Sequence, residues 1–348
     1  MADIETRIEG RAGRITFARP KALNALSHDM ALAIEAALDA WRDDPAVALI
    51  LIDAEGERAF CAGGDIAQMY AAGMAGDYDA PRRFWRDEYR MNAKIAEYPK
   101  PIVALMQGFV MGGGVGVGCN AAIRVVGETS QVAMPESGIG LVPDVGGSLL
   151  LARAPGHAGE YLALTAARMN AADAVFAGFA DHFVPEAEWA ALTARLVETG
   201  DADAVATAAR PAPDGVLSAE AATIDRLFAG DTLADIRAGL AGAEGTLAEK
   251  ALKAVDRNSP LSMACGMEML RRLRAPGTTI RDSLALEYRF TYRAIPEADF
   301  LEGVRAQIID KDRNPRWRHA APAEVTADEV AHMLAPLGNH ELWQEETP

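Results

Sequence analysis

Two acidic residues, Glu136 and Asp144, are the first side chains in this sequence whose type and spacing could do chemistry. They stand eight residues apart in the segment 133–147, which is apolar and is interrupted by glycine and proline. Burial raises the pKa of a carboxyl group, and two neighbouring carboxyl groups push their pKa values apart, which suits a general acid and a general base. The structural alternative is that Asp144 caps a helix while Glu136 faces water.

Two glycine-rich turns could provide backbone N–H groups for an anionic oxygen. Gly63 and Gly64 precede Asp65, where a strand pattern gives way to a helix pattern, and a second turn begins at 112–114. Backbone amides aimed at an oxygen that gains negative charge can contribute strongly to catalysis. Glycines also occur in tight turns simply because they adopt positive φ, so a purely structural interpretation of both turns stays open.

The second turn also permits a competing interpretation. Gly116, Gly118 and Ala121 match the dinucleotide-binding pattern GxGxxA, and Glu136 lies twenty residues after Gly116, where an acid that binds ribose could stand. That pattern normally opens the first strand–helix–strand unit of a domain, whereas here two strands and several helices are expected before it. A dinucleotide-binding oxidoreductase is therefore kept as an alternative of another class.

Other site patterns fail when their residues are checked. Asp310, Asp312 and Asn314 resemble a calcium loop, but Pro315 stands where glycine is required. The six histidines show no HxH or HxxxH spacing, and Ser148 lacks the second glycine of a GxSxG nucleophile elbow. We therefore expect neither a metal ion nor a serine nucleophile.

The elements that must position these residues follow an alternating α/β pattern. Ser27 is expected to cap a helix that Pro45 ends, and a second helix is expected over residues 81–98. Apolar runs predict strands at 14–17, 48–52, 102–106, 123–126 and 131–134.

The second half of the chain differs in composition. From about residue 186 the sequence is rich in alanine and helical in pattern, and a chain of 348 residues is long enough for a large domain with an elaboration, or for two domains. The predicted organisation is an α/β core at 1–185 that carries the site, and a mainly α-helical region at 186–348 that packs on it.

Charge and cysteine content limit the classes of partner and the cellular compartment that we expect for this chain. The chain has 34 basic and 50 acidic residues, a formal charge of −16, which disfavours nucleic acid and anionic membrane surfaces. A small anionic ligand is not excluded, because a few basic side chains can bind it locally. The three cysteines form no CxxC pair, the first residues lack the parts of a secretory signal, and no apolar run reaches about 18 residues. We expect a cytoplasmic protein without a membrane partner.

Four motifs carry a resemblance to a known family; they lie at 19–26, 59–66, 112–114 and 134–136. Taken in this order and spacing, they resemble the enoyl-CoA hydratase/isomerase (crotonase) superfamily over residues 10–185. The resemblance implies a spiral of ββα units. It also implies an oxyanion hole for a thioester carbonyl, formed by the backbone amides of Gly64 and Gly113.

The resemblance also indicates a branch of the superfamily. Hydratases carry a second glutamate three positions after the second glycine of the GGG motif, and this chain has Gly116 there. Asp144, with the segments 86–89, 299–306 and 309–317, instead resembles the branch that hydrolyses 3-hydroxyisobutyryl-CoA in valine breakdown. Dienoyl-CoA isomerases share the spacing of the two acids. The resemblance therefore implies a short-chain 3-hydroxyacyl-CoA thioester hydrolase, with an acyl-CoA isomerase or hydratase on the same fold as the alternative.

The resemblance assigns substrate contacts to Glu88, Gly113, Glu136 and Asp144. Glu136 would attack the carbonyl to give a mixed anhydride, or it would activate water. Asp144 would position the hydroxyacyl group or the water, and Glu88 would lie near the acyl hydroxyl. No cofactor is implied, because CoA is part of the substrate, and a homo-oligomer is left open.

Three of the implied contacts have plain structural alternatives. Glu88 could be a helix-surface acid that pairs with Arg86 or Arg90. Arg19 and Lys21 lie in the segment that the superfamily places along CoA, and they could equally be solvated loop charges.

Overall fold

The computed structural model describes residues 3–343, which form two compact units. Unit 1 consists of Met1–Asp65, Asp87–Ala133 and Arg168–Ala219, and unit 2 consists of Ile66–Arg86, Met134–Ala167 and Glu220–Pro348. Two segments from the first half of the chain, Ile66–Arg86 and Met134–Ala167, thus belong to the same compact unit as the C-terminal helices. The organisation into 1–185 and 186–348 stays a prediction.

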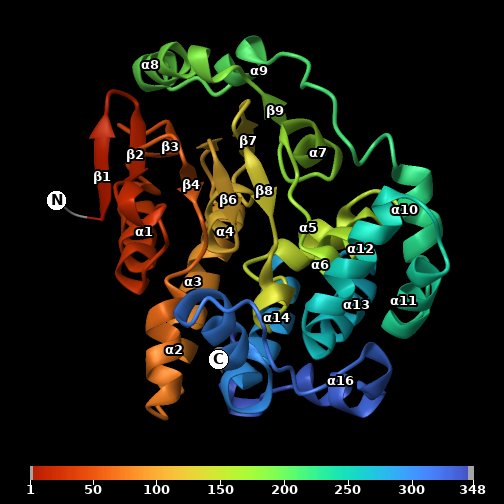
Figure 1. Ribbon diagram of the computed structural model, residues 1–348. Helices are drawn as coiled ribbons and strands as arrows, with labels where there is room; N and C mark the ends of the chain where they lie inside the picture. Colours follow the sequence, from red (N-terminus) through yellow and green to blue (C-terminus); the bar gives the residue numbers. More distant parts are fainter. Residues whose placement is uncertain (1–2, 344–348) are drawn as a thin grey trace. The chain divides into compact units, whose positions relative to one another are not determined.

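Unit 1 is built on two sheets (Figure 1). The larger has the order β1-β2-β3-β5-β7-β9 and is parallel except between β1 and β2. Its strands are Ile4–Glu9, Ala12–Phe17, Leu49–Ala54, Ile102–Met106, Ile123–Val126 and His182–Phe183. The smaller sheet has the parallel order β4-β6-β8, with strands Ala59–Cys61, Phe109–Met111 and Gln131–Ala133.

Pairs of strands followed by a helix repeat along the chain. β3 and β4, β5 and β6, and β7 and β8 each place one strand in the larger sheet and the next in the smaller one. This is the spiral of ββα units that the resemblance implies. The strand predicted at 102–106 matches β5 residue for residue, since an uninterrupted apolar run is typical of a parallel strand buried on both faces.

Helices cover the sheets of unit 1. α1 (His28–Trp41) begins as predicted, because the Ser27 hydroxyl accepts a hydrogen bond from the Met30 amide at 3.3 Å. The other helices assigned wholly or partly to this unit are α3 (Asp79–Ala96), α4 (Gly113–Gly118), α7 (Ala171–Phe176), α8 (Trp189–Thr199) and α9 (Ala204–Ala208). α8 and α9 bury leucine and valine side chains in the same core cluster as β3 and β5.

Between α1 and α3, the carboxylate of Glu35 is held by two cations. Arg90 donates to its oxygens at 2.7 and 2.6 Å, and the Lys94 ammonium lies 3.0 Å away. Burial by itself would raise the pKa of Glu35, but the hydrogen bonds and charges of Arg90 and Lys94 outweigh it and hold the pKa below its usual range.

Because of this ion cluster, we expect the free energy of unfolding to decrease at acidic pH. A carboxyl group whose pKa is lowered by folding adds stability above its unfolded value of about 4.3, and this stability is lost as the pH falls through the folded value. We expect Glu35→Gln to lower the free energy of unfolding at pH 7 and to flatten its decline below about pH 4.3. Urea unfolding of both proteins across this range measures the effect, and an unchanged acid dependence in the variant would contradict it.

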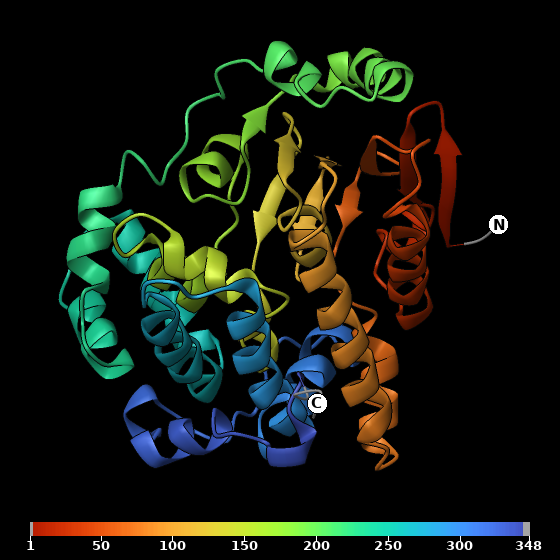
Figure 2. The same cartoon turned by 180° about the vertical axis from the view of Figure 1, so that it is seen from behind.

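Unit 2 is mainly helical, as expected for the C-terminal half of the chain. Figure 2 shows its later helices in teal to blue. Its helices before residue 220, besides the first part of α3, are α2 (Ile66–Met74), the short 3-10 turn η2 (Glu136–Ile139), α5 (Gly147–Arg153) and α6 (Ala158–Thr165). Its later helices include α10 (Ala221–Phe228), α11 (Leu233–Ala241), α12 (Thr246–Arg257), α13 (Pro260–Leu273), α14 (Ile280–Glu297), α15 (Phe300–Val304) and α16 (Ala327–Met333). α13 packs against α5 and α6, and α14 packs against α5.

Across residues 3–343, no helix is both long enough and apolar enough to cross a membrane.

Candidate active site

Unit 1 brings together three of the residues proposed for the site. Gly113 opens α4, and a Cβ atom at Gly113 would lie 3.5 Å from the Gly64 amide nitrogen and 2.9 Å from Oε1 of Glu88. The bridge beside Gly64 uses the Gly63 carbonyl and the Asp65 amide, which bond to Leu26. The Gly64 amide is therefore not part of that pairing, and the amide of a first helical residue has no acceptor within its helix.

The glycines after Gly113 serve close packing. A Cβ at Gly114 would lie 2.2 Å from the Cys61 carbonyl oxygen, and one at Gly118 would lie 2.5 Å from Sδ of Met106. Gly116 and Gly118 lie inside α4, whereas a dinucleotide fingerprint places its glycines in the turn that precedes the helix. The dinucleotide interpretation is therefore wrong, and Gly114 and Gly118 let the helix approach the sheets.

Glu88 is a buried residue of α3, with 3 % of its surface exposed. The neighbouring Arg90 pairs instead with Glu35 and with Asp87, at 2.6 and 2.9 Å. The interpretation of Glu88 as a helix-surface acid is therefore wrong. A buried carboxylate beside Gly113 can accept a hydrogen bond from a substrate hydroxyl, and that role stays a prediction.

The loop at residues 19–26, which bonds to the Gly63–Asp65 turn through Leu26, is fixed by Asn24. No role was predicted for Asn24 from the sequence. Asn24 is fully buried, has a φ of 54°, and donates to the carbonyls of Ala59 and Glu55 at 2.8 and 3.0 Å. Arg19, in the same loop, is half-buried and pairs with Asp3 and Asp65 at 3.2 and 3.5 Å.

The two basic residues proposed for CoA thus differ in setting. Lys21 is exposed, whereas the charge of Arg19 is already engaged beside the Gly64 turn. Contact of either with CoA stays a prediction.

Cys61, next to the glycine turn, is an unsuitable nucleophile. Burial raises the pKa of its thiol to about 12, and the nearby Glu88 charge also raises it. The thiol is therefore protonated at neutral pH, and the thiolate is the reactive form of cysteine.

Unit 2 holds both acids of the segment 133–147, and both are buried. Glu136 opens η2 and is 5 % exposed, and Asp144 is 4 % exposed. The N-cap residue of α5 is Gly146, which has no side chain to accept a capping hydrogen bond. The structural alternatives for this pair are therefore wrong, because Glu136 does not face water and Asp144 does not cap the helix. Their catalytic roles stay predictions.

Residues far along the chain hold the Glu136 turn in place. The Ser259 amide donates to the Ser137 carbonyl at 3.0 Å, and the Asn258 amide group donates to the Ser137 hydroxyl at 3.2 Å. On the other side, a Cβ at Gly303 of α15 would lie 2.2 Å from the Ile139 backbone. The sequence signal for the Gly303 contact was the resemblance of the segment 299–306.

Gly303 offers a test of this close approach. In Gly303→Ala the methyl group would meet backbone atoms that cannot rotate away, so we expect a loss of roughly 1–3 kcal/mol in the free energy of unfolding. The matched control is Gly239→Ala in α11, where an added Cβ meets nothing within 4 Å. This control should be neutral or slightly stabilising. Urea unfolding measures both, and equal stability of the two variants would contradict the packing described.

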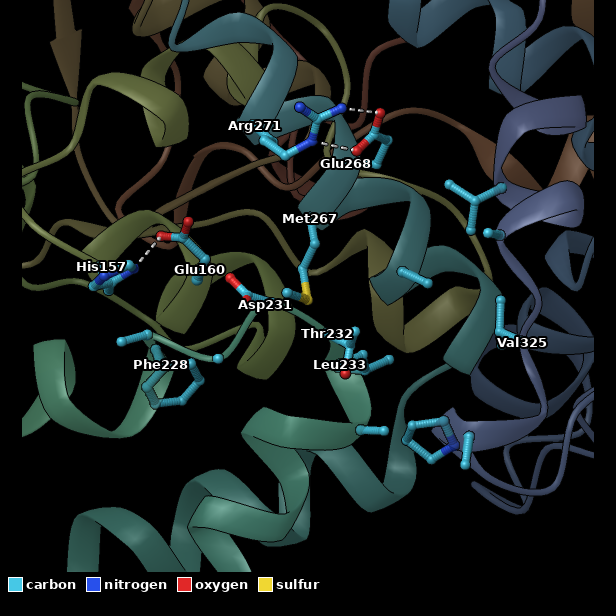
Figure 3. Close-up of a pocket in the computed structure, with 18 of the residues that line it drawn as sticks. His157, Glu160, Phe228, Asp231, Thr232, Leu233, Met267, Glu268, Arg271 and Val325 are labelled. Carbon is cyan, nitrogen blue, oxygen red and sulfur yellow. Dashed lines mark hydrogen bonds and ion pairs between the residues drawn. The ribbon is translucent and has the colours of Figure 1, made fainter.

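A separate cavity of about 540 Å³ lies among α6, α10, α11, α13 and α16 of unit 2 (Figure 3). It is lined by none of the residues proposed for the site. Four of its charged groups form ion pairs: Arg274 binds Glu160, and Arg271 binds Glu268 at 2.7 Å.

The acidic residues that resembled a calcium loop form ion pairs. Asp310 and Asp312 both pair with Arg305, at 2.7 and 2.8 Å. Among the residues that the structure describes, no group of three or more histidine, cysteine or acidic side chains is arranged to hold a metal ion.

The comparisons with known proteins agree with this fold. The family model described as enoyl-CoA hydratase/isomerase matches residues 12–334, so the chain belongs to that family. Its curated relatives include "3-hydroxyisobutyryl-CoA hydrolase, mitochondrial" of Gallus gallus, 39% identical over 98% of this chain and 91% of the relative. The human protein of the same name is 36% identical over 96% of this chain and 89% of the relative.

Solved structures of the family are similar over nearly the whole chain. An enoyl-CoA hydratase from Rhodobacter sphaeroides has a TM-score of 0.95 and 59% identity, covering 99% of this chain and 100% of its own. A carnitinyl-CoA dehydratase from Mycobacterium thermoresistibile has a TM-score of 0.94 and 42% identity, with the same coverage. The crotonase fold expected from the sequence motifs is confirmed.

Proposed function

We propose that this protein hydrolyses 3-hydroxyisobutyryl-CoA to 3-hydroxyisobutyrate and CoA. The observation that carries the proposal is the pair of acids: Asp144 is a second buried carboxyl group on the segment of Glu136, while Gly116 stands where a hydratase has its second glutamate. Curated relatives of that name match between 96% and 98% of the chain, so the likeness includes the segments of both units.

The proposed chemistry needs two kinds of group. The amides of Gly64 and Gly113 receive the thioester oxygen, which gains negative charge when the carbonyl carbon is attacked. Glu136 either attacks that carbon or takes a proton from the water that does so. Asp144 positions the acyl group or the water. The C–S bond then breaks, and the thiolate of CoA leaves and is protonated. If Glu136 attacks, this leaves a mixed anhydride that water hydrolyses, and the oxygen of water ends in the product or in the Glu136 carboxylate. If activated water attacks, its oxygen ends in the product carboxylate.

The proposed substrate contains a hydroxyl group. This hydroxyl would donate a hydrogen bond to the buried Glu88 carboxylate. A site with a buried polar partner discriminates strongly against a substrate that lacks the matching group. We therefore propose that Glu88 favours 3-hydroxyacyl esters over plain acyl esters. Arg19 and Lys21 are proposed to lie along CoA, with no further cofactor.

A second candidate is hydration of an enoyl-CoA, which is favoured by the 59% identity to the Rhodobacter sphaeroides protein described as an enoyl-CoA hydratase. Against it, the position of the second hydratase glutamate holds Gly116, which has no carboxylate. Gly116 is buried inside α4, and its amide donates to the Gly112 carbonyl at 3.0 Å. An isomerase that moves a double bond is the third candidate.

One substrate panel separates these activities. The purified protein is incubated with 3-hydroxyisobutyryl-CoA, 3-hydroxypropionyl-CoA, isobutyryl-CoA and crotonyl-CoA, and both free CoA and hydrated product are measured. The proposal predicts free CoA from the two hydroxyacyl esters and neither reaction with crotonyl-CoA. Hydration of crotonyl-CoA, without release of CoA from any ester, would establish the second candidate instead.

The cellular setting is proposed from the charge and the cysteine content of the chain. The negative charge and isolated cysteines support a cytoplasmic enzyme whose partner is a small acyl-CoA. The named relatives are described as mitochondrial. The cytoplasmic location and any homo-oligomer therefore stay predictions.

A further inference from the structure

The turn that carries Asp144 has an unusual backbone. Val145 and Gly146 both have positive φ, 55° and 85°, and the Gly147 amide donates to the Asp144 carbonyl at 2.7 Å. This is the pattern of a type I′ turn, in which both central residues have positive φ. Valine is a costly residue there, because a β-branched side chain crowds the backbone in the left-handed region. Such strain persists only where the surrounding structure enforces it.

The group that enforces it is a fully buried acid on α14. Glu287 accepts hydrogen bonds from the Gly146 amide at 2.9 Å and the Ser148 amide at 3.2 Å. The hydroxyls of Ser148 and Ser283 also donate to it, at 2.5 and 2.9 Å. The two amides flank the start of α5, which packs against α14 (Figure 1). Burial raises the pKa of Glu287, although these hydrogen bonds act in the opposite direction.

Burial of an acid is costly unless its oxygens are well supplied with donors, and here three of the four donors belong to Gly146 in the turn and to Ser148 directly after it. The carboxylate therefore fixes where the Asp144 backbone can lie. The serine that sequence reasoning excluded as a nucleophile, Ser148, is one of those donors. We infer that Glu287 is a positioning residue for Asp144, which it holds in place through the strained turn at 144–147. This inference rests on the proposed function of Asp144 in thioester hydrolysis.

Glutamine at position 287 is the sharpest probe. Oε2 of Glu287 accepts from Gly146, and Oε1 accepts from Ser148 and the two hydroxyls. In either orientation, the NH₂ group of glutamine would face a backbone N–H and could not accept from it. Glu287→Gln therefore keeps the shape of the side chain and releases one end of the turn. Ser283→Ala is the matched control, because it removes one hydroxyl donor to Glu287 and leaves the hydrogen bonds from the Gly146 and Ser148 amides intact.

The experiment measures kcat and KM for CoA release from 3-hydroxyisobutyryl-CoA. We expect Glu287→Gln to lower kcat by about 10- to 100-fold with little change in KM, since small displacements of a reacting group have effects of this size. Ser283→Ala should stay within about twofold of the unmodified protein in kcat. In an Asp144→Asn background, Glu287→Gln should cause no further loss, because it acts through the side chain already disabled.

Three results would overturn the inference: an unchanged kcat in folded Glu287→Gln, an equal loss in Ser283→Ala, or a full additional loss in the Asp144→Asn background. If Glu287→Gln does not fold, amide hydrogen exchange of the unmodified protein decides. The Gly146 and Ser148 amides should exchange slowly, and exchange as fast as in an exposed loop contradicts the inference. If instead the unmodified protein releases no CoA from any ester, the proposed function fails, while slow exchange would still show that Glu287 holds the turn.

Discussion

Replacing Glu136 by glutamine is expected to lower kcat for hydrolysis of 3-hydroxyisobutyryl-CoA by about 10²- to 10⁴-fold, the range found when a positioned acid or base is lost. KM should change little, because an amide of the same shape still fills the buried site at the start of η2. Asp144→Asn should lower kcat by about 10²-fold or more for the same reason. Steady-state kinetics on folded protein measure both.

The control for these variants is another buried acid of unit 2. Glu160 is 6 % exposed and pairs with Arg274 at the cavity of Figure 3. Glu160→Gln should reduce stability, since it breaks a buried ion pair, and should leave kcat per folded molecule unchanged. If all three variants lost stability alike and kept their turnover, Glu136 and Asp144 would be structural acids and the proposed function would lose its basis.

Gly113→Ala is expected to lower kcat/KM by about 10²- to 10³-fold, because the added methyl group crowds the space beside the two amides; an effect of this size is found when one donor of an oxyanion hole is lost. The added methyl group would press on Oε1 of Glu88 at 2.9 Å and on Cδ2 of Leu26 at 3.3 Å, and would lie 3.5 Å from the Gly64 nitrogen. It therefore crowds Glu88 and Leu26 and reaches van der Waals contact with the Gly64 amide.

Stability and turnover should separate in this variant. Gly113 has an ordinary backbone conformation at the start of α4, so alanine strains no dihedral angle there, and the thermal midpoint should fall only slightly. Gly239→Ala, the same change at an open position, should keep full activity. Normal turnover by Gly113→Ala would show that the space beside Gly64 does not hold the carbonyl.

Local signals in the sequence predicted the elements well. Ser27 caps α1, and the apolar run at 102–106 is β5, because capping and burial depend on residues close together in the chain. The strand expected before the Gly63–Gly64 turn is β4, but β6 escaped prediction. β6 has three residues, which are too few positions to show a period.

The site was predicted in its residues but not in its supports. The two acids and two glycine turns stand out because their residue types are unusual in apolar segments. Glu287 lies on α14, about 140 residues beyond the turn it holds, and nothing in its local sequence distinguishes it from a surface glutamate of an amphipathic helix. Glu88 was open to the surface interpretation for the same reason, since only the fold shows that it is buried.

The most direct test of the proposed hydrolysis is a single-turnover reaction of excess protein with 3-hydroxyisobutyryl-CoA in ¹⁸O-labelled water, followed by mass spectrometry of product and protein. We expect release of CoA by the unmodified protein, with the labelled oxygen recovered in 3-hydroxyisobutyrate or in the carboxyl group of Glu136, and no release by Glu136→Gln on the same timescale. Label in Glu136 identifies an anhydride that water opens at the Glu136 carbon, and label only in the product identifies attack of water on the acyl carbon. Release of CoA by Glu136→Gln at the rate of the unmodified protein would contradict the proposed role of Glu136.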